Sequence, residues 1–343
     1  MKDYLDFMRE NSRDLSKNSL LAIVCNIKSS EIVAETYGDF STDTEFLSDN
    51  ELAQVIKMAS AQEIPFRVFT SEDSFIRYML SHNINLERII VYNSAQSGTG
   101  AGRKALIPSL CNYYGMRHTG SDAYRVSLCR DKFAISAILN KLGINIPESY
   151  LFINGNIDAE LKKNQKYIAK PIYESASIGI KKENVFEGSA IPFRYLRNLE
   201  KTMHQPLIIQ EFINGYEIEV PVLAGGKSYY AFSPAVLHRS TDSLIMGNDI
   251  LDYEKIYYDA YLFSSLPNFI SDNPIKQTAC KVAEKLCLSG LCRVDFRLKE
   301  DLSFFVTDVS TNPHFISHSS VNFAFKQLGL DDRQLFHTIL TLS

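Results

Sequence analysis

The chain lacks the features that mark several classes of protein. Its 36 lysines and arginines are outnumbered by 40 aspartates and glutamates, and the net charge of −4 gives no global positive field for nucleic acid or anionic membranes. None of the six cysteines forms a C-x-x-C pair, and no Cys/His cluster has zinc-site spacing. The longest apolar runs, such as LLAIVC, are too short to cross a bilayer. These absences favour a globular protein without nucleic-acid or membrane partners, whose sites for anionic ligands are built locally.

Two further properties concern location and size. The N-terminal residues MKDYLDFMRENSRDLSKNS are charged throughout and lack the apolar core of a signal peptide. Together with cysteines that suit a reducing compartment, this predicts a cytoplasmic protein. A chain of 343 residues is too long for one ordinary core and suggests two or three domains. We expect three, spanning 1–117, 118–204 and 205–343.

The first domain reads as alternating strands and helices. Apolar runs at 19–27, 65–70 and 87–93 suit buried strands, and helical spacing of apolar residues covers 49–64 and 71–83. Another helix is expected at 104–115, ended by Gly115. Strand and helix in alternation predict a parallel sheet covered by helices. The segment GTGAGRK (98–104) lacks full G-x-G-x-x-G spacing, so we interpret it as a glycine-rich loop of this domain near the substrate site.

The most informative stretch is the hairpin predicted over residues 290–310. In LCRVDFRL the side chains of Arg293, Asp295 and Arg297 share a polar face. In FFVTDVS strict alternation places four side chains on one face: Phe304, Val306, Asp308 and Ser310. Folding the hairpin about residues 301–302 sets Asp295 nearly opposite Asp308. Two facing carboxylates repel unless a cation lies between them, and oxygen ligands favour Mg²⁺. A hairpin with a solvated polar face is the alternative.

Four motifs in order resemble the D-alanine–D-alanine ligase family of the ATP-grasp superfamily. TGSDA (119–123) with DK (131–132) is similar to its interdomain helix, and AKPIYESASIGI (169–180) to its K-P-x-x-E-G-S-S-x-G-V loop. IIQEFINGYEIEV (208–220) resembles its adenine hinge, and R-x-D-F followed by DVSTNP and S-H-S resembles its metal-binding end. The resemblance spans about residues 120–335. It implies an α/β (α+β) ATP-grasp fold, in which an N-terminal parallel α/β domain precedes two α+β domains that clasp ATP.

The resemblance also assigns roles in binding ATP and metal. Lys132 and Lys170 would neutralise the phosphates, and a surface ammonium is the alternative for each lysine. In the hinge, the backbone near Glu211 and Ile213 would meet adenine, and Glu217 would accept the ribose hydroxyls. Because Glu217 alternates with Glu219, one of the two could instead lie on an outer face. The metal ligands would be Asp295, Asp308 and Ser310, holding Mg²⁺ or alternatively Mn²⁺.

Further positions concern the chemistry and the substrates. Catalytic roles fall on Arg293, which would bind the developing oxyanion, on Ser177 in the phosphate loop and on Tyr257 in the closing segment LDYEKIYYDAY (251–261). Tyrosine-rich packing is an equal alternative for Tyr257, since Ile256 takes the place of the family's lysine. Amino-acid-like substrates would be held by four residues: Ser319, His318, His314 and Glu31.

The implied reaction is ATP-dependent amide or peptide bond formation through an acyl phosphate, with release of ADP and phosphate. Several positions depart from the family pattern: Asp308 for Glu, Ser310 for Asn, Ala176 for Ser and His314 for Gly. They predict a donor other than D-alanine and a role in small-metabolite biosynthesis. The alternatives are a genuine D-alanine–D-alanine ligase of cell-wall synthesis, another ATP-grasp enzyme acting on a phosphorylated or carboxylated small molecule, and a non-catalytic ATP-binding protein. The resemblance also suggests a homodimer formed through the first domain.

Overall fold

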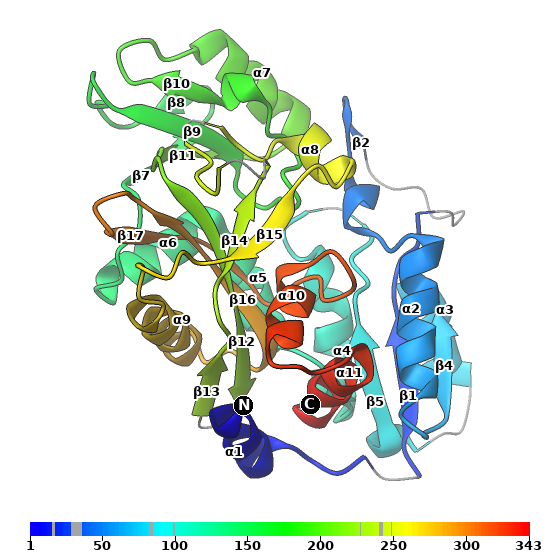
Figure 1. Cartoon of the computed structure of the whole chain (residues 1–343). Coiled ribbons are helices and arrows are strands. Elements are labelled where there is room, and N and C mark those ends of the chain that lie inside the picture. Colours follow the sequence, from blue (N-terminus) through cyan, green and yellow to red (C-terminus); the bar gives the residue numbers. More distant parts are fainter. Residues whose placement is uncertain are drawn as a thin grey trace.

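The computed structural model covers residues 1–343 and describes all of them except 16–17, 29–35, 82–84, 99, 227, 240–242 and 248. Its strands form one parallel sheet, two larger antiparallel sheets and one small ribbon. Figure 1 shows the three main sheets in separate parts of the molecule, with the first in blue and cyan and the second in green. No helix among the described residues is long and apolar enough to cross a membrane.

The parallel sheet has the strand order β4-β1-β5-β6. Its strands are β1 (Leu20–Val24), β4 (Phe66–Phe69), β5 (Ile89–Asn93) and β6 (Arg117–His118). Successive side chains point to opposite faces, so Leu21 and Ile23 join one core while Ala22 and Val24 join another. The first core contains α2 (Asp49–Ser60), and the second contains α3 (Glu72–Ser81) and α4 (Leu106–Tyr114). The predicted parallel α/β layer is confirmed, and Gly115 ends α4 in the left-handed conformation as expected.

The second sheet is antiparallel, with the order β10-β9-β11-β7-β8. Its strands are β7 (Ser149–Ile153), β8 (Asn156–Ile157), β9 (Lys166–Pro171), β10 (Val185–Glu187) and β11 (Leu207–Glu211). Helix α7 (Phe193–Met203) packs on it through Leu196, Leu199 and Met203. The ribbon of β2 (Thr36–Tyr37) and β3 (Phe40–Ser41) adds Tyr37 and Phe40 to the same core. Before this sheet, α5 (Ala123–Arg130) and α6 (Lys132–Lys141) follow one another at Asp131, which caps α6.

The third sheet has the order β15-β14-β12-β16-β17, with β13 also paired to β12. Its strands are β12 (Tyr216–Gly225), β13 (Ser228–Ala231), β14 (Ala235–His238), β15 (Leu262–Ser265), β16 (Gly290–Leu298) and β17 (Phe304–Ser310). One side is covered by α9 (Asn273–Lys285). On the other side, α10 (Ser320–Gln327) and α11 (Asp332–Thr341) share a core with α1 (Lys2–Asn11) and the parallel sheet. Figure 1 shows α10 and α11, in red, between these two sheets.

The hairpin of β16 and β17 has its predicted ends, and Asp295 pairs with Asp308 as expected. The prediction that Phe304 and Val306 share the face of Asp308 is wrong. A register shift pairs Phe296 with Val306, which leaves Thr307 as an extra residue in β17. Because of this β-bulge, Val306 enters the core while Asp308 faces the opposite side.

A close backbone contact lies at the start of the third sheet's central hairpin. Helix α9 ends at Lys285, and Gly290 begins β16 with φ of +71°. A side chain there would meet Gly120, whose backbone nitrogen lies 2.6 Å from an ideal Cβ on Gly290. This contact joins the TGSDA segment to the start of the metal-binding hairpin, and Ser121 Oγ extends it by accepting a hydrogen bond from Ser289 N at 3.1 Å. In the same segment, Asp122 caps the N-terminus of α5.

Candidate active site

A cavity of about 190 Å³ lies between the second and third sheets. Its walls come from β9, β11, β12, β16, β17, the loop 174–180 and the segment 250–256. Nine of the residues singled out in the sequence line it: Lys132, Lys170, Ser177, Glu211, Ile213, Glu217, Arg293, Asp295 and Asp308. The structure therefore gathers most of the predicted nucleotide and metal positions in one place.

The acidic part of the cavity is formed by Asp295 and Asp308, which are cross-strand partners. Burial raises the pKa of Asp295 to about 7; Arg293 opposes this shift, and the negative charges of Glu219 and Asp308 add to it. Burial would also raise the pKa of Asp308, but Lys132 and other cations outweigh it and hold that pKa below its usual range. The metal-free site thus has one carboxylate that resists ionisation and one that remains ionised.

The donor set of this acidic pair fits a magnesium ion. No cluster of three or more His, Cys, Asp or Glu side chains suited to a metal occurs in the described part of the chain. Mg²⁺ bound with a nucleotide commonly takes only one or two carboxylates and completes its shell with phosphate oxygens and water. Asp295 and Asp308 would supply those carboxylates. Ser310, the third predicted ligand, is the last residue of β17, pairs with Arg293 of β16 and is not among the residues lining the cavity.

Arg293 is held by two carboxylates. Its guanidinium donates to Asp295 at 2.7 and 2.8 Å, and its Nη1 lies 2.9 Å from Glu219 Oε2. Although burial acts to lower it, these neighbours raise the pKa of Arg293 above its usual range, so the cation is permanent. The arginine can therefore present a fixed positive charge to an oxyanion.

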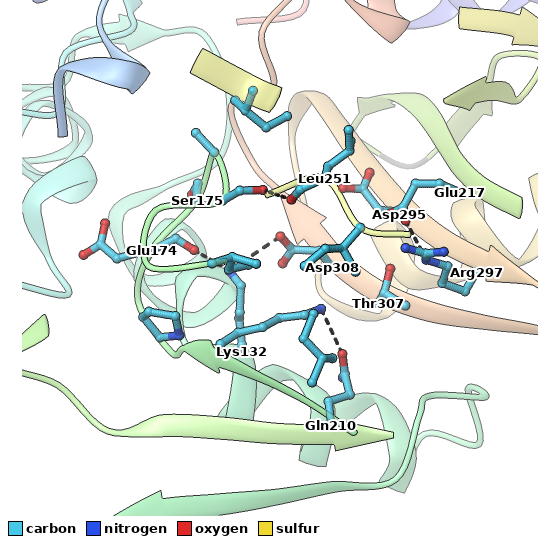
Figure 2. A pocket seen from close by; sticks show the side chains of 18 of the residues that line it. Lys132, Glu174, Ser175, Gln210, Glu217, Leu251, Asp295, Arg297, Thr307 and Asp308 are labelled. Carbon is cyan, nitrogen blue, oxygen red and sulfur yellow. Dashed lines mark hydrogen bonds and ion pairs between the residues drawn. The ribbon is translucent and has the colours of Figure 1, made fainter. Parts of the chain in front are cut away.

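The two lysines approach from the opposite wall. Lys132 is the first residue of α6; its Nζ donates to the backbone oxygen of Glu174 at 2.7 Å and lies 3.6 Å from Asp308 Oδ2. Lys170 lies on β9, and its Nζ donates to Gln210 Oε1 at 3.1 Å. Burial lowers the pKa of Lys170. Figure 2 shows Asp308 near the middle of the cavity, with Lys132 and Gln210 toward the second sheet.

The hinge between β11 and β12 forms the end of the cavity. Glu211, Phe212 and Ile213 line it, and Gly215 lets the chain pass the backbone oxygen of Leu298, which lies 2.0 Å from an ideal Cβ. Both acidic residues of β12, Glu217 and Glu219, line the cavity, so neither lies on an outer face.

Each acidic residue of β12 is matched with an arginine of β16. Arg297 Nε lies 2.5 Å from Glu217 Oε2, just as Arg293 pairs with Glu219. The Arg297 guanidinium also lies 5.5 Å from the centre of the Phe212 ring, at the hinge. A carboxylate held in this way has one fixed orientation.

The loop after β9 closes the cavity over the lysines. Ala176 and Ser177 have φ of +50° and +54°, a left-handed backbone conformation that residues other than glycine rarely adopt. Ser177 Oγ donates to the backbone oxygen of Leu251 at 2.6 Å, which ties this loop to the closing segment. In Figure 2, Ser175 and Leu251 lie on the side of the cavity away from Gln210.

The closing segment does not present the predicted tyrosine. Within α8 (Tyr253–Tyr257), Ile256 lines the cavity, whereas Tyr257 does not and is 46% exposed. Lys255 is buried away from the cavity; its Nζ donates to Asp249 at 2.8 Å and lies 3.2 Å from Asp252. The segment is thus held by its own ion pairs and by Tyr253, whose hydroxyl accepts a hydrogen bond from Ser41 N.

The predicted substrate residues lie apart from the cavity lining. Ser319 is buried and caps α10, where its Oγ accepts from Asn322 N at 3.1 Å. His318 stacks on Tyr261 at 4.5 Å, and His314 Nε2 lies 3.1 Å from Glu51 on α2. Glu31 lies outside the described residues. The structure therefore does not bring these four side chains together with the phosphate half of the site.

Several cavity residues were not singled out in the sequence as site residues: Glu174, Gln210, Phe212, Glu219, Arg297 and Thr307. Two of them had a usable signal, since Glu219 and Arg297 follow the alternation that points to Glu217 and Asp295. Thr307 had none, because the β-bulge that turns it into the cavity breaks the alternation.

The family described as D-ala D-ala ligase C-terminus matches residues 138–341, which is more than half of the chain. The protein belongs to this D-alanine–D-alanine ligase family. Relatives include the D-alanine–D-alanine ligase of Aquifex aeolicus, 25% identical over 243 residues, with 70% of this chain and 78% of the relative covered. D-alanine–D-alanine ligase B of Pseudomonas syringae pv. tomato is 24% identical over 313 residues, with 90% and 91% covered.

Solved structures of this D-alanine–D-alanine ligase family have the same fold. The D-alanine–D-alanine ligase of Bacillus anthracis complexed with ATP superposes with a TM-score of 0.66 at 13% identity, covering 94% of this chain and 97% of that one. The VanG D-Ala:D-Ser ligase of Enterococcus faecalis gives 0.66 at 18% identity, covering 95% and 99%. The predicted family and its ATP-grasp fold are thus confirmed.

Proposed function

We propose that this protein is an ATP-dependent ligase that joins a carboxylate to an amine, with amino-acid-like substrates and release of ADP and phosphate. The observation that carries the proposal is the pairing, within one cavity, of Lys132 and Lys170 with Asp295 and Asp308. Membership of the ligase family supports the reaction class. Separated charges of both signs suit a triphosphate and its cation better than they suit an apolar ligand.

The residues would divide the work as follows. Lys132 and Lys170 would neutralise phosphate oxygens, while Glu217, oriented by Arg297, would accept the ribose hydroxyls. A bound magnesium ion would supply charge neutralisation and orient the phosphates. Arg293 would hold the oxyanion that develops when an amine attacks the acyl phosphate, because its charge is permanent and fixed. Ser177 would keep the loop closed over the phosphates through its bond to Leu251.

Five further roles stay predictions of the sequence: those of Ser310, Tyr257, Ser319, His318 and His314. Ser319 would hold the acceptor's carboxylate only if its hydroxyl can serve both that ligand and the cap of α10. A substrate role for Glu31 likewise rests on the sequence resemblance.

A panel assay tests the proposal. Phosphate release from Mg-ATP would be measured with D- and L-amino acids and small amino-carboxylates, singly and in pairs, with mass spectrometry of the products. We expect release that requires one specific donor and acceptor and yields a product lighter than their sum by one water. The Asp308→Asn variant should lose release, and chelation of divalent ions should abolish it in the native protein. Tight ATP binding without release for every pair would contradict the proposal.

A second candidate is a D-alanine–D-alanine ligase in the strict sense, favoured by the names of the relatives. The departures at Ala176 and His314 argue for a different donor. Incubation with D-alanine alone separates the two candidates, because rapid formation of D-Ala-D-Ala would establish the strict ligase.

A further inference from the structure

A cluster of buried charges lies behind the phosphate loop, and one of its members, Glu174, also lines the cavity. The cluster joins Glu45 at the end of a 3₁₀ turn, Arg103 and Lys104 from the glycine-rich segment, Arg130 at the end of α5, and Glu174. Arg103 pairs with both Glu45 and Glu174, the latter at 2.9 Å. Arg130 Nη2 lies 3.3 Å from Glu174, and Lys104 Nζ lies 2.7 Å from Glu45. The cluster thus joins residues of the N-terminal parallel α/β layer to the loop over the cavity.

Burying this many charges costs desolvation free energy, which the pairing offsets only in part. Three cations face two carboxylates, and apart from Lys104 the side chains are 5% exposed or less. Within the described part of the chain, Nε and Nη1 of Arg103 and of Arg130 are buried without an acceptor. Buried, incompletely paired charges add little net stability, but they fix the positions of the groups that do pair. The group they fix here is the Glu174 carboxylate.

Glu174 connects the cluster to the cavity through its two ends. Its carboxylate accepts from Arg103, from Arg130 and from Gln205 Nε2 at 3.1 Å. Its backbone oxygen accepts from Lys132 Nζ at 2.7 Å, and that ammonium lies 3.6 Å from Asp308. Figure 2 shows the Glu174 carboxylate pointing away from the cavity centre, where Asp308 lies. A shift of the carboxylate would therefore move the oxygen that holds Lys132.

The residues that follow Glu174 need such an anchor. Ala176 and Ser177 are both left-handed, and strained backbone persists only where the surroundings determine it. Ser177 is tied at one end by its bond to Leu251. Glu174, tied by Arg103, secures the other end.

We propose that Arg103 is a positioning residue for the phosphate loop. Acting through Glu174, it sets the loop 174–179 and the Lys132 ammonium in the arrangement that receives the phosphates of ATP. The inference rests on the proposed use of ATP. It gives the glycine-rich segment a role in holding the loop, rather than the predicted one near the substrate, because neither Arg103 nor Lys104 lines the cavity.

Steady-state kinetics of Arg103→Met, Arg103→Lys and Glu174→Gln test this role. We expect Arg103→Met to lower kcat/KM for ATP on the order of tenfold to a hundredfold, as small misplacements of binding groups do. Arg103→Lys should recover part of the loss, because it keeps the charge with fewer donors. Arg125→Met is the matched control, since Arg125 is a partly exposed arginine of α5 that pairs with Asp122; it should stay within about twofold of the native protein.

A double-mutant cycle with Lys132→Met separates positioning from a general structural effect. If Arg103 acts through Lys132, Arg103→Met should cost little more once Lys132 is absent. Equal losses in both backgrounds, or native kinetics in a folded Arg103→Met variant, would overturn the proposal. Should Arg103→Met fail to fold, Glu174→Gln, which keeps the size and polarity of the side chain, carries the same cycle.

Nucleotide affinity keeps the inference separate from the proposed function. If the native protein releases no phosphate with any substrate, the ligase proposal fails. Calorimetry with a non-hydrolysable Mg-ATP analogue still decides the role of Arg103. We expect the Arg103→Met variant to bind this analogue about tenfold more weakly than the native protein does. Unchanged affinity would overturn the proposed role of Arg103.

Discussion

Replacing Asp295 by asparagine should remove the activity. In the metal-free protein, the stability of this variant relative to the native protein should increase as the pH rises. Burial raises the pKa of Asp295 to about 7 in the folded protein, compared with 3.8 for the free side chain. The folded state therefore keeps its proton to a higher pH than the unfolded state does. The resulting loss of stability is absent below about pH 4, grows up to about pH 7 and is constant above it.

The size of the effect follows from the pKa difference. Each unit corresponds to about 1.4 kcal/mol, so the full penalty is at most about 4 kcal/mol, and about 3 kcal/mol of it develops between pH 5 and pH 8. The asparagine variant resembles the protonated acid and escapes this change. The attraction between the ionised carboxylate and Arg293 is already contained in the pKa of about 7, so its loss in the variant adds no further pH dependence.

Thermal midpoints of metal-free protein at pH 5, 6.5 and 8 provide the assay. With an unfolding entropy of about 2.1 cal/mol/K per residue, the 343-residue variant should gain about 4 °C on the native protein between pH 5 and pH 8. Asp301→Asn, at the exposed turn of the same hairpin, is the control and should show no such gain, because its carboxyl has a lowered pKa. A midpoint difference that does not change with pH would refute the reasoning, and so would phosphate release by Asp295→Asn at the native rate.

Three further changes have defined outcomes. Glu217→Gln should raise the KM for ATP about tenfold or more, since a hydrogen bond to a charged group contributes about 1.5–3 kcal/mol, with little change for 2′,3′-dideoxy-ATP; equal changes for both nucleotides would contradict ribose binding. Gly290→Ala should lower the thermal midpoint, because its Cβ would lie 2.6 Å from a backbone nitrogen, whereas Gly329→Ala, with similar φ and open space, should cost less. Burial raises the pKa of Glu51, but hydrogen bonds, including one from His314, outweigh it and lower that pKa to about 2. The ionised Glu51 should therefore add up to about 3 kcal/mol to the free energy of unfolding above pH 4.5, and this stabilisation should be lost as the pH falls toward 2. In acid unfolding, the difference in free energy of unfolding between the native protein and Glu51→Gln should shrink as the pH falls over this range.

The sequence alone determined the elements whose signals are local. Alternation predicted both strands of the hairpin and the pairing of Asp295 with Asp308, because the period of a strand and the length of its turn fix the register. The order of short motifs predicted the family and nine of the residues that line the cavity. The break in alternation at Thr307 was not predicted, because a bulge depends on which side chains the neighbouring core accepts.

Only the tertiary structure decided how distant segments share the work. Nothing local in the sequence connects Glu45, Arg103 and Glu174, which are far apart along the chain and meet because the first layer packs against the loop after β9. The same holds for Lys255, which the fold turns into an internal ion pair so that Ile256 takes the place at the cavity. Buried charges must find partners wherever the fold provides them, so their pairing is a property of the packed molecule and not of any one segment.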